Sequence, residues 1–303
     1  MSNLRDSRLM SGLLFASLGA ILFSGKAIVV KLTYRYGIDA VTIIMYRMLF
    51  ALPLFAAMGW WGSRGKAPLP GRDWAHVVGL GFLGYYVAIT LNLMGLEHVT
   101  ASLERLIGYL NPTLVMLLCW LLFRKPVRRM HLVGIAISYC GVFIAFGQEL
   151  IQMGASVTWG AGLTLASAIT YSCYLVYSGH LVQRLGSLRL VGMATSVAAV
   201  LCILQFLVLR PLDVALSVAP EVIWLSILNA TLCTALPALM LMMGIERVGP
   251  AMTAQAGMIG PLSTLAMGVL ILNEPLTSWL VAGTVLVIAG IYVFSRGAGT
   301  PAR

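Results

Sequence analysis

The chain has 303 residues, of which 60% are hydrophobic and only 10% are charged, and its formal net charge is +10. Soluble domains carry roughly 25% charged residues, so this composition excludes an ordinary water-soluble protein and indicates a chain that resides in lipid. The positive charge does not indicate nucleic-acid binding, because the basic residues stand singly or in small groups between apolar runs.

Long apolar runs follow one another along the whole chain. A helix needs about 20 apolar residues to cross a bilayer core of roughly 30 Å. The polar connections between the runs are too short to contain a soluble domain. The sequence therefore predicts an all-α integral membrane protein of ten transmembrane helices, over residues 10–33, 39–61, 74–95, 99–123, 130–147, 158–180, 189–209, 220–243, 249–272 and 278–296.

The distribution of Lys and Arg predicts the orientation in the membrane, because cytoplasmic loops carry an excess of these residues. With the N-terminus in the cytoplasm, fourteen of them fall on the inner side and three on the outer side. We therefore expect both termini in the cytoplasm and a multi-pass protein of the plasma membrane, which is the inner membrane in a Gram-negative bacterium.

The chain also repeats itself internally. A shift of 149 residues places residues 95–144 on 244–293 without a gap, and the coinciding positions include four glycines and two prolines. Five helices is an odd number, so the second half must enter the membrane from the opposite side. The sequence predicts two inverted five-helix repeats, residues 1–148 and 149–303, an architecture that supports alternating access.

Two related segments carry a resemblance to a known family. The segment GLEHVTAS at 95–102 runs into Asn111-Pro112, and GIERVGPA at 244–251 runs into Gly260-Pro261 and ends in LNEPL at 272–276. Together they resemble the drug/metabolite transporter superfamily, specifically its EamA-type exporters. This resemblance implies ten helices and the export of small metabolites.

A narrower resemblance concerns the substrate. Gly84-Tyr85-Tyr86, together with Tyr109 before Asn111-Pro112, is similar to the aromatic amino acid exporters of that superfamily. The chain departs from that subgroup in the first helix, where Phe23-Ser24-Gly25-Lys26 replaces a Trp-containing motif. The resemblance implies export of amino acids or other small metabolites and leaves the substrate itself open.

Four ionisable residues fall inside the predicted helices, toward the outer face: Lys26, Arg47, Glu104 and Arg105. Such groups cost roughly 2.5–3.5 kcal/mol on insertion scales and commonly mark functional sites. Glu104 cannot face Arg105, since neighbouring residues on a helix point about 100° apart, so we expect it to pair with Lys26 or Arg47. The four form either an outer gate or a site for a substrate carboxylate, or else a structural ion pair that fixes the helix register.

Polar and aromatic groups nearer the bilayer centre are the candidates for substrate binding, because ligand pockets combine apolar walls with a few placed polar groups. For each tyrosine taken alone, simple packing between helices is the favoured interpretation, whereas the set as a whole resembles the lining of a pocket. The candidates are Tyr85, Tyr109, Asn111, Tyr171, Tyr174 and Gln255.

The sequence contains no catalytic, nucleotide-binding or metal-binding motif, so we expect neither an enzyme nor a cofactor. The prediction is a monomeric transporter in a lipid bilayer, with a small-molecule substrate and no nucleic-acid partner. It exports small metabolites, above all aromatic or other hydrophobic amino acids, by alternating access around a central cavity. The alternative is a passive channel or a lipid or metabolite flippase with the same inverted-repeat fold.

Overall fold

The computed structural model describes residues 2–108, 110–123, 129–241, 243, 244, 247 and 259–298. Within these ranges the regular structure is entirely helical. The elements of the first half are α1 (Ser2–Tyr34), α2 (Ala40–Ser63), α3 (Gly71–Leu80), the π-helix η1 (Gly81–Val87), α4 (Ala88–Leu96), α5 (Ala101–Gly108), α6 (Asn111–Phe123) and α7 (Arg129–Met153). Those of the second half are α8 (Ser156–Leu185), α9 (Ser187–Leu209), α10 (Leu212–Leu216), α11 (Pro220–Ala230), the π-helix η2 (Thr231–Ala235), α13 (Ile259–Leu272) and α14 (Ser278–Ala298).

Each of the ten predicted apolar runs contains helix, and residues 236–241 continue the helix after η2. By length and composition, six described segments are able to cross a membrane: Met10–Tyr34, Ala40–Ser63, Gly71–Leu96, Ala101–Leu122, Ser187–Leu209 and Pro220–Leu241. Shorter apolar helices cover Leu132–Gly147, Ser263–Leu272 and Ser278–Gly290. Large apolar side chains such as Val208, Leu270 and Trp224 point outward from the bundle, as expected of a surface that faces lipid rather than water.

One predicted helix is divided in the structure. The run 99–123 was expected as a single helix, but α5 ends at Gly108, Leu110 forms a turn and α6 begins at Asn111. Pro112 explains the division, because a proline has no backbone N–H and so cannot donate a helical hydrogen bond to the carbonyl of Gly108, the residue at which α5 ends.

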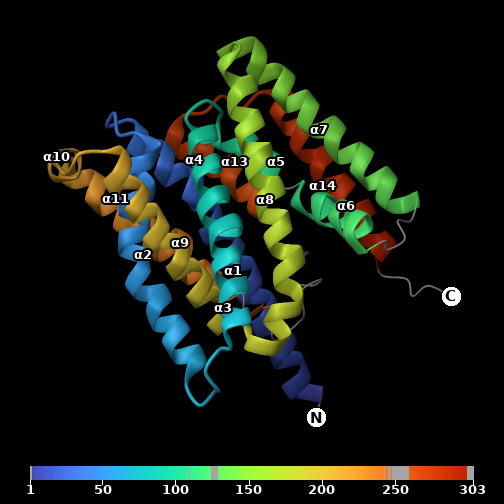
Figure 1. The fold of residues 1–303 in the computed structure, drawn as a ribbon. Helices are drawn as coiled ribbons and strands as arrows, with labels where there is room; N and C mark the ends of the chain where they lie inside the picture. The colour runs from blue at the N-terminus through green and yellow to red at the C-terminus, as the bar shows by residue number, and fades with distance from the viewer. Residues whose placement is uncertain are drawn as a thin grey trace.

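Helices that correspond under the 149-residue shift pack against each other. α7 lies along α14, and α2 lies along α9 (Figure 1). The contacts of α8 and of its counterpart α1 correspond in the same way: α8 contacts α3, η1 and α6, while α1 contacts α11, η2 and α13. These described contacts are therefore preserved when the two halves are interchanged.

The repeated glycines lie at the contact between α7 and α14. A methyl group at Gly141 would lie 2.5 Å from the carbonyl oxygen of Gly283, and one at Gly290 would lie 2.6 Å from that of Gly134. Only glycine permits such close approach of two helix backbones. The shift relates Gly134 to Gly283 and Gly141 to Gly290, so the two contacts are equivalent.

Both halves contain a π-helix at the same place. The shift carries residues 81–87 to 230–236, and η2 covers Thr231–Ala235. π-helices are rare and are frequent at functional sites. Hydropathy does not distinguish π-helices from α-helices, so neither one was predicted from the sequence.

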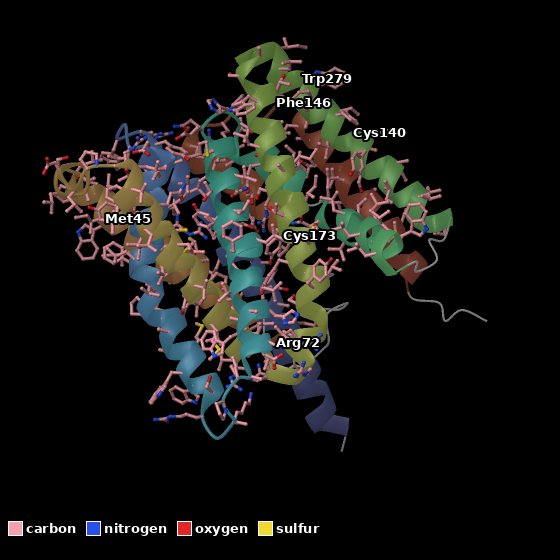
Figure 2. All side chains as sticks on the ribbon, viewed as in Figure 1. Met45, Arg72, Cys140, Phe146, Cys173 and Trp279 are labelled. Carbon is pink, nitrogen blue, oxygen red and sulfur yellow. The ribbon has the colours of Figure 1, made fainter. Side chains whose placement is uncertain are left out.

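The described connections alternate between the two ends of the bundle. Arg72 lies at the end near the N-terminus, and Trp279 lies at the opposite end (Figure 2). We call the second the distal end; it carries the α1–α2, α4–α5, α7–α8 and α13–α14 connections (Figure 1). At the N-terminal end, Lys66 Nζ donates a hydrogen bond to the Leu185 carbonyl at 3.0 Å and so joins the α2–α3 connection to α8.

Candidate functional site

The predicted ion pair forms between Lys26 and Glu104. Lys26 Nζ, on α1, lies 3.4 Å from Glu104 Oε1, on α5, and the two side chains are only 11% and 7% exposed. Asn92 on α4 joins them: its Oδ1 accepts a hydrogen bond from Lys26 Nζ at 2.8 Å, and its Nδ2 donates one to Glu104 Oε1 at 2.7 Å. The three side chains tie α1, α4 and α5 together. Sequence analysis did not assign Asn92 to this site, because no spacing rule links residues on different helices.

Arg105 points to a different neighbour, as expected for the residue next to Glu104. Its Nη2 donates a hydrogen bond to Ser24 Oγ at 3.1 Å, and its guanidinium carbon lies 5.4 Å from the centre of the Phe23 ring. Lys26 Nζ lies 5.6 Å from the same ring centre. Phe23 therefore supplies an aromatic face to two of the cations.

Arg47 on α2 is the most deeply buried of the four charged residues, at 3% exposure. Its Nε donates a hydrogen bond to Thr234 Oγ1 on η2 at 3.0 Å, and that hydroxyl donates to the Asn229 carbonyl, five residues earlier, at 2.8 Å. Arg47 also lies close enough to Lys26 and Glu104 to interact electrostatically. The four ionisable residues therefore form one charged cluster, comprising Lys26, Arg47, Glu104 and Arg105.

The charged cluster contains polar atoms that are buried without a hydrogen-bond partner in the part of the chain that the structure describes. Arg47 Nη1 and Glu104 Oε2 are among them. Buried donors and acceptors are normally satisfied, so each such atom indicates a missing partner such as a ligand or water. The cluster is therefore incomplete in the protein alone.

Three of the predicted substrate-binding tyrosines also lie together. The ring centres of Tyr85 on η1 and Tyr174 on α8 are 5.0 Å apart, and those of Tyr171 and Tyr174 are 5.7 Å apart. A methyl group at Gly84 would lie 2.3 Å from Tyr174, so the absence of a side chain at this position permits η1 and α8 to approach closely. Tyr171 is near enough to Arg105 for an electrostatic interaction. The tyrosine cluster, comprising Tyr85, Tyr171 and Tyr174, therefore adjoins the charged cluster.

The remaining predicted residues divide into two groups. Asn111 is described: Ser172 Oγ lies 3.3 Å from its Oδ1 and 3.5 Å from its carbonyl oxygen. Tyr109 and Gln255 lie outside the described residues.

Lys26 of the charged cluster and Tyr174 of the tyrosine cluster occupy equivalent positions in the two halves. Ser24 Oγ lies 3.0 Å from the Gly260 carbonyl, just as Ser172 Oγ lies 3.5 Å from that of Asn111. Each carbonyl immediately precedes one of the repeated prolines. The pairs related by a shift of 148 or 149 are Ser24 and Ser172, Lys26 and Tyr174, Gly260 and Asn111, and Thr234 and Tyr85. The repeat thus contained a signal for Thr234, because its counterpart Tyr85 was already a candidate.

The distal end is held together by the acidic residue of the LNEPL turn. Glu274 Oε1 accepts a hydrogen bond from the backbone N–H of Ala101 at 2.9 Å, and its Oε2 accepts one from Ser102 Oγ at 2.8 Å. A carboxylate at the first turn of α5 satisfies free N–H groups and interacts favourably with the helix dipole. These three residues form the distal latch between the second half and the first. Beside it, Arg35 Nη2 donates to the Leu272 carbonyl at 2.9 Å.

A second polar contact at the distal end involves Asp39, in the α1–α2 connection. Its carboxylate accepts a hydrogen bond from the Val41 N–H at 3.1 Å and caps α2, and Arg210 Nη2 lies 3.2 Å away. Burial raises the pKa of Asp39, but hydrogen bonds from Thr42 and Arg210 outweigh that effect and hold the pKa below its ordinary value.

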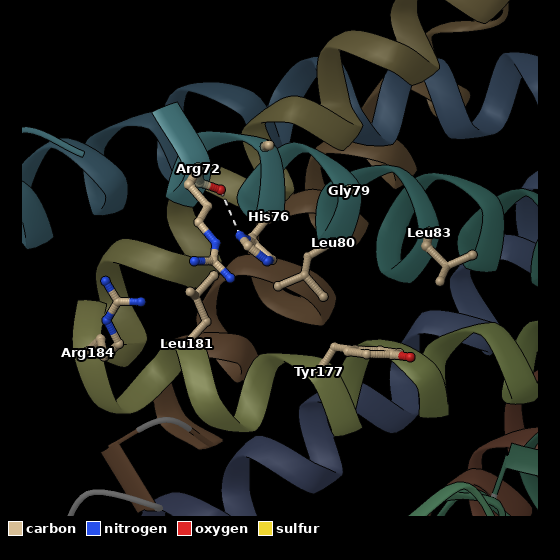
Figure 3. Close-up of a pocket in the computed structure, with 9 residues that line it drawn as sticks. Arg72, His76, Gly79, Leu80, Leu83, Tyr177, Leu181 and Arg184 are labelled. Carbon is tan, nitrogen blue, oxygen red and sulfur yellow. Dashed lines mark hydrogen bonds between the residues drawn. The ribbon is translucent and has the colours of Figure 1, made fainter. Parts of the chain in front are cut away.

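A groove of about 620 Å³ lies between α3 and α8 on the side of the N-terminal end (Figure 3). Arg72 and Arg184 lie at one end of it, and Leu83 and Tyr177 lie at the other (Figure 3). Tyr177 is one helical turn beyond Tyr174, so the apolar end of the groove approaches the tyrosine cluster. The groove is formed by one helix from each half.

The described residues contain no group of three or more His, Cys, Asp or Glu side chains that could bind a metal ion. This finding leaves the charged cluster and the tyrosine cluster as the candidate site.

Comparison with known proteins places the chain among transporters. A sequence model of the EamA-like transporter family matches residues 10–147 and again 158–296. The chain is 28% identical over 274 residues to the Bacillus subtilis (strain 168) protein named "Uncharacterized transporter YcbK". The aligned region covers 88% of this chain and 86% of the Bacillus protein. An "Uncharacterized transporter" of Archaeoglobus fulgidus is 25% identical over 145 residues, 48% of this chain and 49% of that one. A crystal structure of 18% identity shares the fold, with a TM-score of 0.67 over 96% of this chain and 99% of the other.

Proposed function

Because the chain belongs to the EamA-like transporter family, we propose that this multi-pass membrane transporter exports aromatic or other hydrophobic amino acids by alternating access. The observation that carries the proposal is the equivalence of the two halves. Their helix contacts, glycine contacts and π-helices correspond under the shift of about 149 residues. Two related halves that pack by equivalent contacts have two related arrangements, one open to each side.

In this proposal, residues 1–148 and 149–303 are inverted five-helix repeats with both termini in the cytoplasm. Two findings support that topology: the described connections alternate between the ends of the bundle, and the Lys and Arg bias puts the N-terminal end inside. The distal latch then closes the outer side. The groove between α3 and α8 is on the inner side, where an exported molecule enters.

The two clusters have separate roles in the proposed cycle. The tyrosine cluster, with Asn111, contacts the hydrophobic part of the substrate, and Tyr109 and Gln255 remain candidates for the same pocket. The charged cluster gates the outer side, because Lys26 and Glu104 tie α1 to α5 through a buried ion pair. Opening toward the outside requires these helices to separate. Replacement of Glu104 by Gln is therefore expected to change the transport rate.

Counterflow in proteoliposomes tests the proposal. Vesicles that contain unlabelled phenylalanine or leucine are expected to accumulate the labelled amino acid transiently, with saturation, whereas protein-free vesicles are not. A passive channel, the alternative function, gives uptake that rises linearly with concentration and does not respond to substrate on the far side. A thermal-shift screen against amino acids selects the labelled compound, because a bound ligand raises the unfolding temperature.

A further inference from the structure

The charged cluster has an excess of positive charge. Lys26, Arg47 and Arg105 contribute three cations, whereas Glu104 contributes one carboxylate. Lys26, Arg47 and Glu104 are all buried. Unpaired charge is costly in such surroundings, and a buried cation is normally matched by an anion with good hydrogen-bond geometry. The excess therefore calls for an anion that the described part of the chain does not supply.

Glu104 lies near enough to Arg47 for an electrostatic interaction, but no hydrogen bond joins the two side chains in the part of the chain that the structure describes. Glu104 Oε1 already accepts hydrogen bonds from Lys26 and Asn92. Arg47 uses its Nε for Thr234, while Nη1 is buried without a partner among the described residues. A guanidinium group presents its N–H donors in a planar fork that fits a carboxylate. The unpartnered Nη1 of Arg47 is therefore a donor from which one oxygen of a carboxylate is able to accept a hydrogen bond.

From this geometry we infer that Arg47 binds the carboxylate of the transported molecule, and that the substrates are hydrophobic carboxylates whether or not they carry an amino group. The inference rests on the proposed function and sharpens it, because it makes the carboxylate essential and the amino group dispensable. The unpartnered Glu104 Oε2 is no site for a substrate ammonium group, because Lys26 and Arg105 both act on that carboxylate and repel a further cation.

The surroundings agree with a substrate that is anionic at one end and apolar at the other. The tyrosine cluster lies next to Arg105 and offers aromatic surface to a hydrophobic body. The groove at the N-terminal end carries Arg72 and Arg184, of which Arg184 pairs with Asp73 at 3.1 Å. A groove lined by an excess of positive charge raises the local concentration of anions.

Three matched compounds test the inference on the unmodified protein: L-phenylalanine, 3-phenylpropanoate, which lacks the amino group, and 2-phenylethylamine, which lacks the carboxylate. We expect the first two to inhibit counterflow at concentrations within threefold of each other. The amine is expected to require at least tenfold more. An amine that inhibits as well as the acids overturns the inference while leaving transport of amino acids intact.

Binding to the purified protein separates this inference from the proposed function. We expect both carboxylates, but not the amine, to raise the unfolding temperature. If they do so and no counterflow occurs with any amino acid, the carboxylate site stands and the transport proposal fails. If none of the three binds or the amine binds equally well, the carboxylate site is wrong.

Variants locate the site on Arg47. Arg47→Gln is expected to weaken inhibition by 3-phenylpropanoate at least tenfold, and Arg47→Lys to weaken it less, because it keeps the charge but not the planar fork. The control is Arg64→Gln, which removes an arginine outside the site; the guanidinium carbon of Arg64 lies 3.9 Å from the centre of the Trp60 ring. We expect 3-phenylpropanoate to inhibit counterflow by this variant as strongly as counterflow by the unmodified protein. If 3-phenylpropanoate inhibits Arg47→Gln and the control variant equally, Arg47 does not bind the carboxylate. If Arg47→Gln does not fold, the lysine variant and the compound series decide the question.

Discussion

The buried pair of Lys26 and Glu104 makes a quantitative prediction about stability. Glu104→Gln removes the carboxylate of the charged cluster and leaves its cations buried without one. Breaking a buried ion pair by removing one partner costs about 3–5 kcal/mol of unfolding free energy. Replacing both partners by neutral groups of similar size is less costly, because Lys26 then leaves no buried charge beside the missing carboxylate. We therefore expect Lys26→Met to recover much of the stability that Glu104→Gln loses.

A double-mutant cycle measures this recovery. The unfolding free energies of the native protein, Lys26→Met, Glu104→Gln and the double variant are compared by titration with a denaturing detergent in mixed micelles, followed by tryptophan fluorescence. Residues in direct contact show interaction energies of about 0.5–3 kcal/mol, and we expect the upper part of this range because both side chains are buried.

The pair of Asp39 and Arg210 is the matched control, because its N–O distance of 3.2 Å is similar but its side chains are 33% and 41% exposed. Exposed pairs contribute about 0.2–1 kcal/mol. An interaction energy for Lys26 and Glu104 no larger than that of the control would refute the reasoning, since it would mean that burial does not strengthen the pair.

Three further predictions follow from the contacts of the two halves and of the distal end. Gly290→Ala is expected to destabilise the protein by about 1–3 kcal/mol, because the added methyl group overlaps the backbone of α7. The control is Gly147→Ala, since a methyl group at Gly147 would have no neighbour within 4 Å. Equal unfolding temperatures of the two variants would contradict the close contact at Gly290. Asp39 has a pKa below its ordinary value, so its contribution to stability is present above about pH 4 and is lost as the pH falls below that value. We therefore expect the unfolding temperature of Asp39→Asn to fall less between pH 6 and pH 3 than that of the native protein. An equal fall in both proteins would contradict this role of Asp39. Glu274→Gln weakens the distal latch and is expected to increase labelling, by an impermeant thiol reagent from outside, of a cysteine introduced at the buried Ala101, whose contact with Glu274 is made by its backbone N–H; unchanged labelling argues against a latch.

Much of the helix architecture is readable from the chain alone. The spacing of apolar runs predicts the helices, because a bilayer admits only segments that satisfy their own backbone hydrogen bonds. The internal repeat predicts related halves, and its glycines lie where those halves touch. The cost of burying a carboxylate predicts that Glu104 pairs with Lys26 or Arg47, and in the structure its ion-pair partner is Lys26.

Other features depend on the tertiary structure. Asn92 between Lys26 and Glu104, Thr234 against Arg47 and Glu274 over α5 each join helices that are not consecutive in the chain. Hydropathy fixes which segments lie in the membrane, but it does not fix the rotation of each helix about its axis or its closest neighbours. Packing decides both, and it is packing that leaves Arg47 buried with an unpartnered nitrogen. The sequence therefore determined that charge would lie within the membrane, and only the folded bundle decided which charge remained available for a ligand.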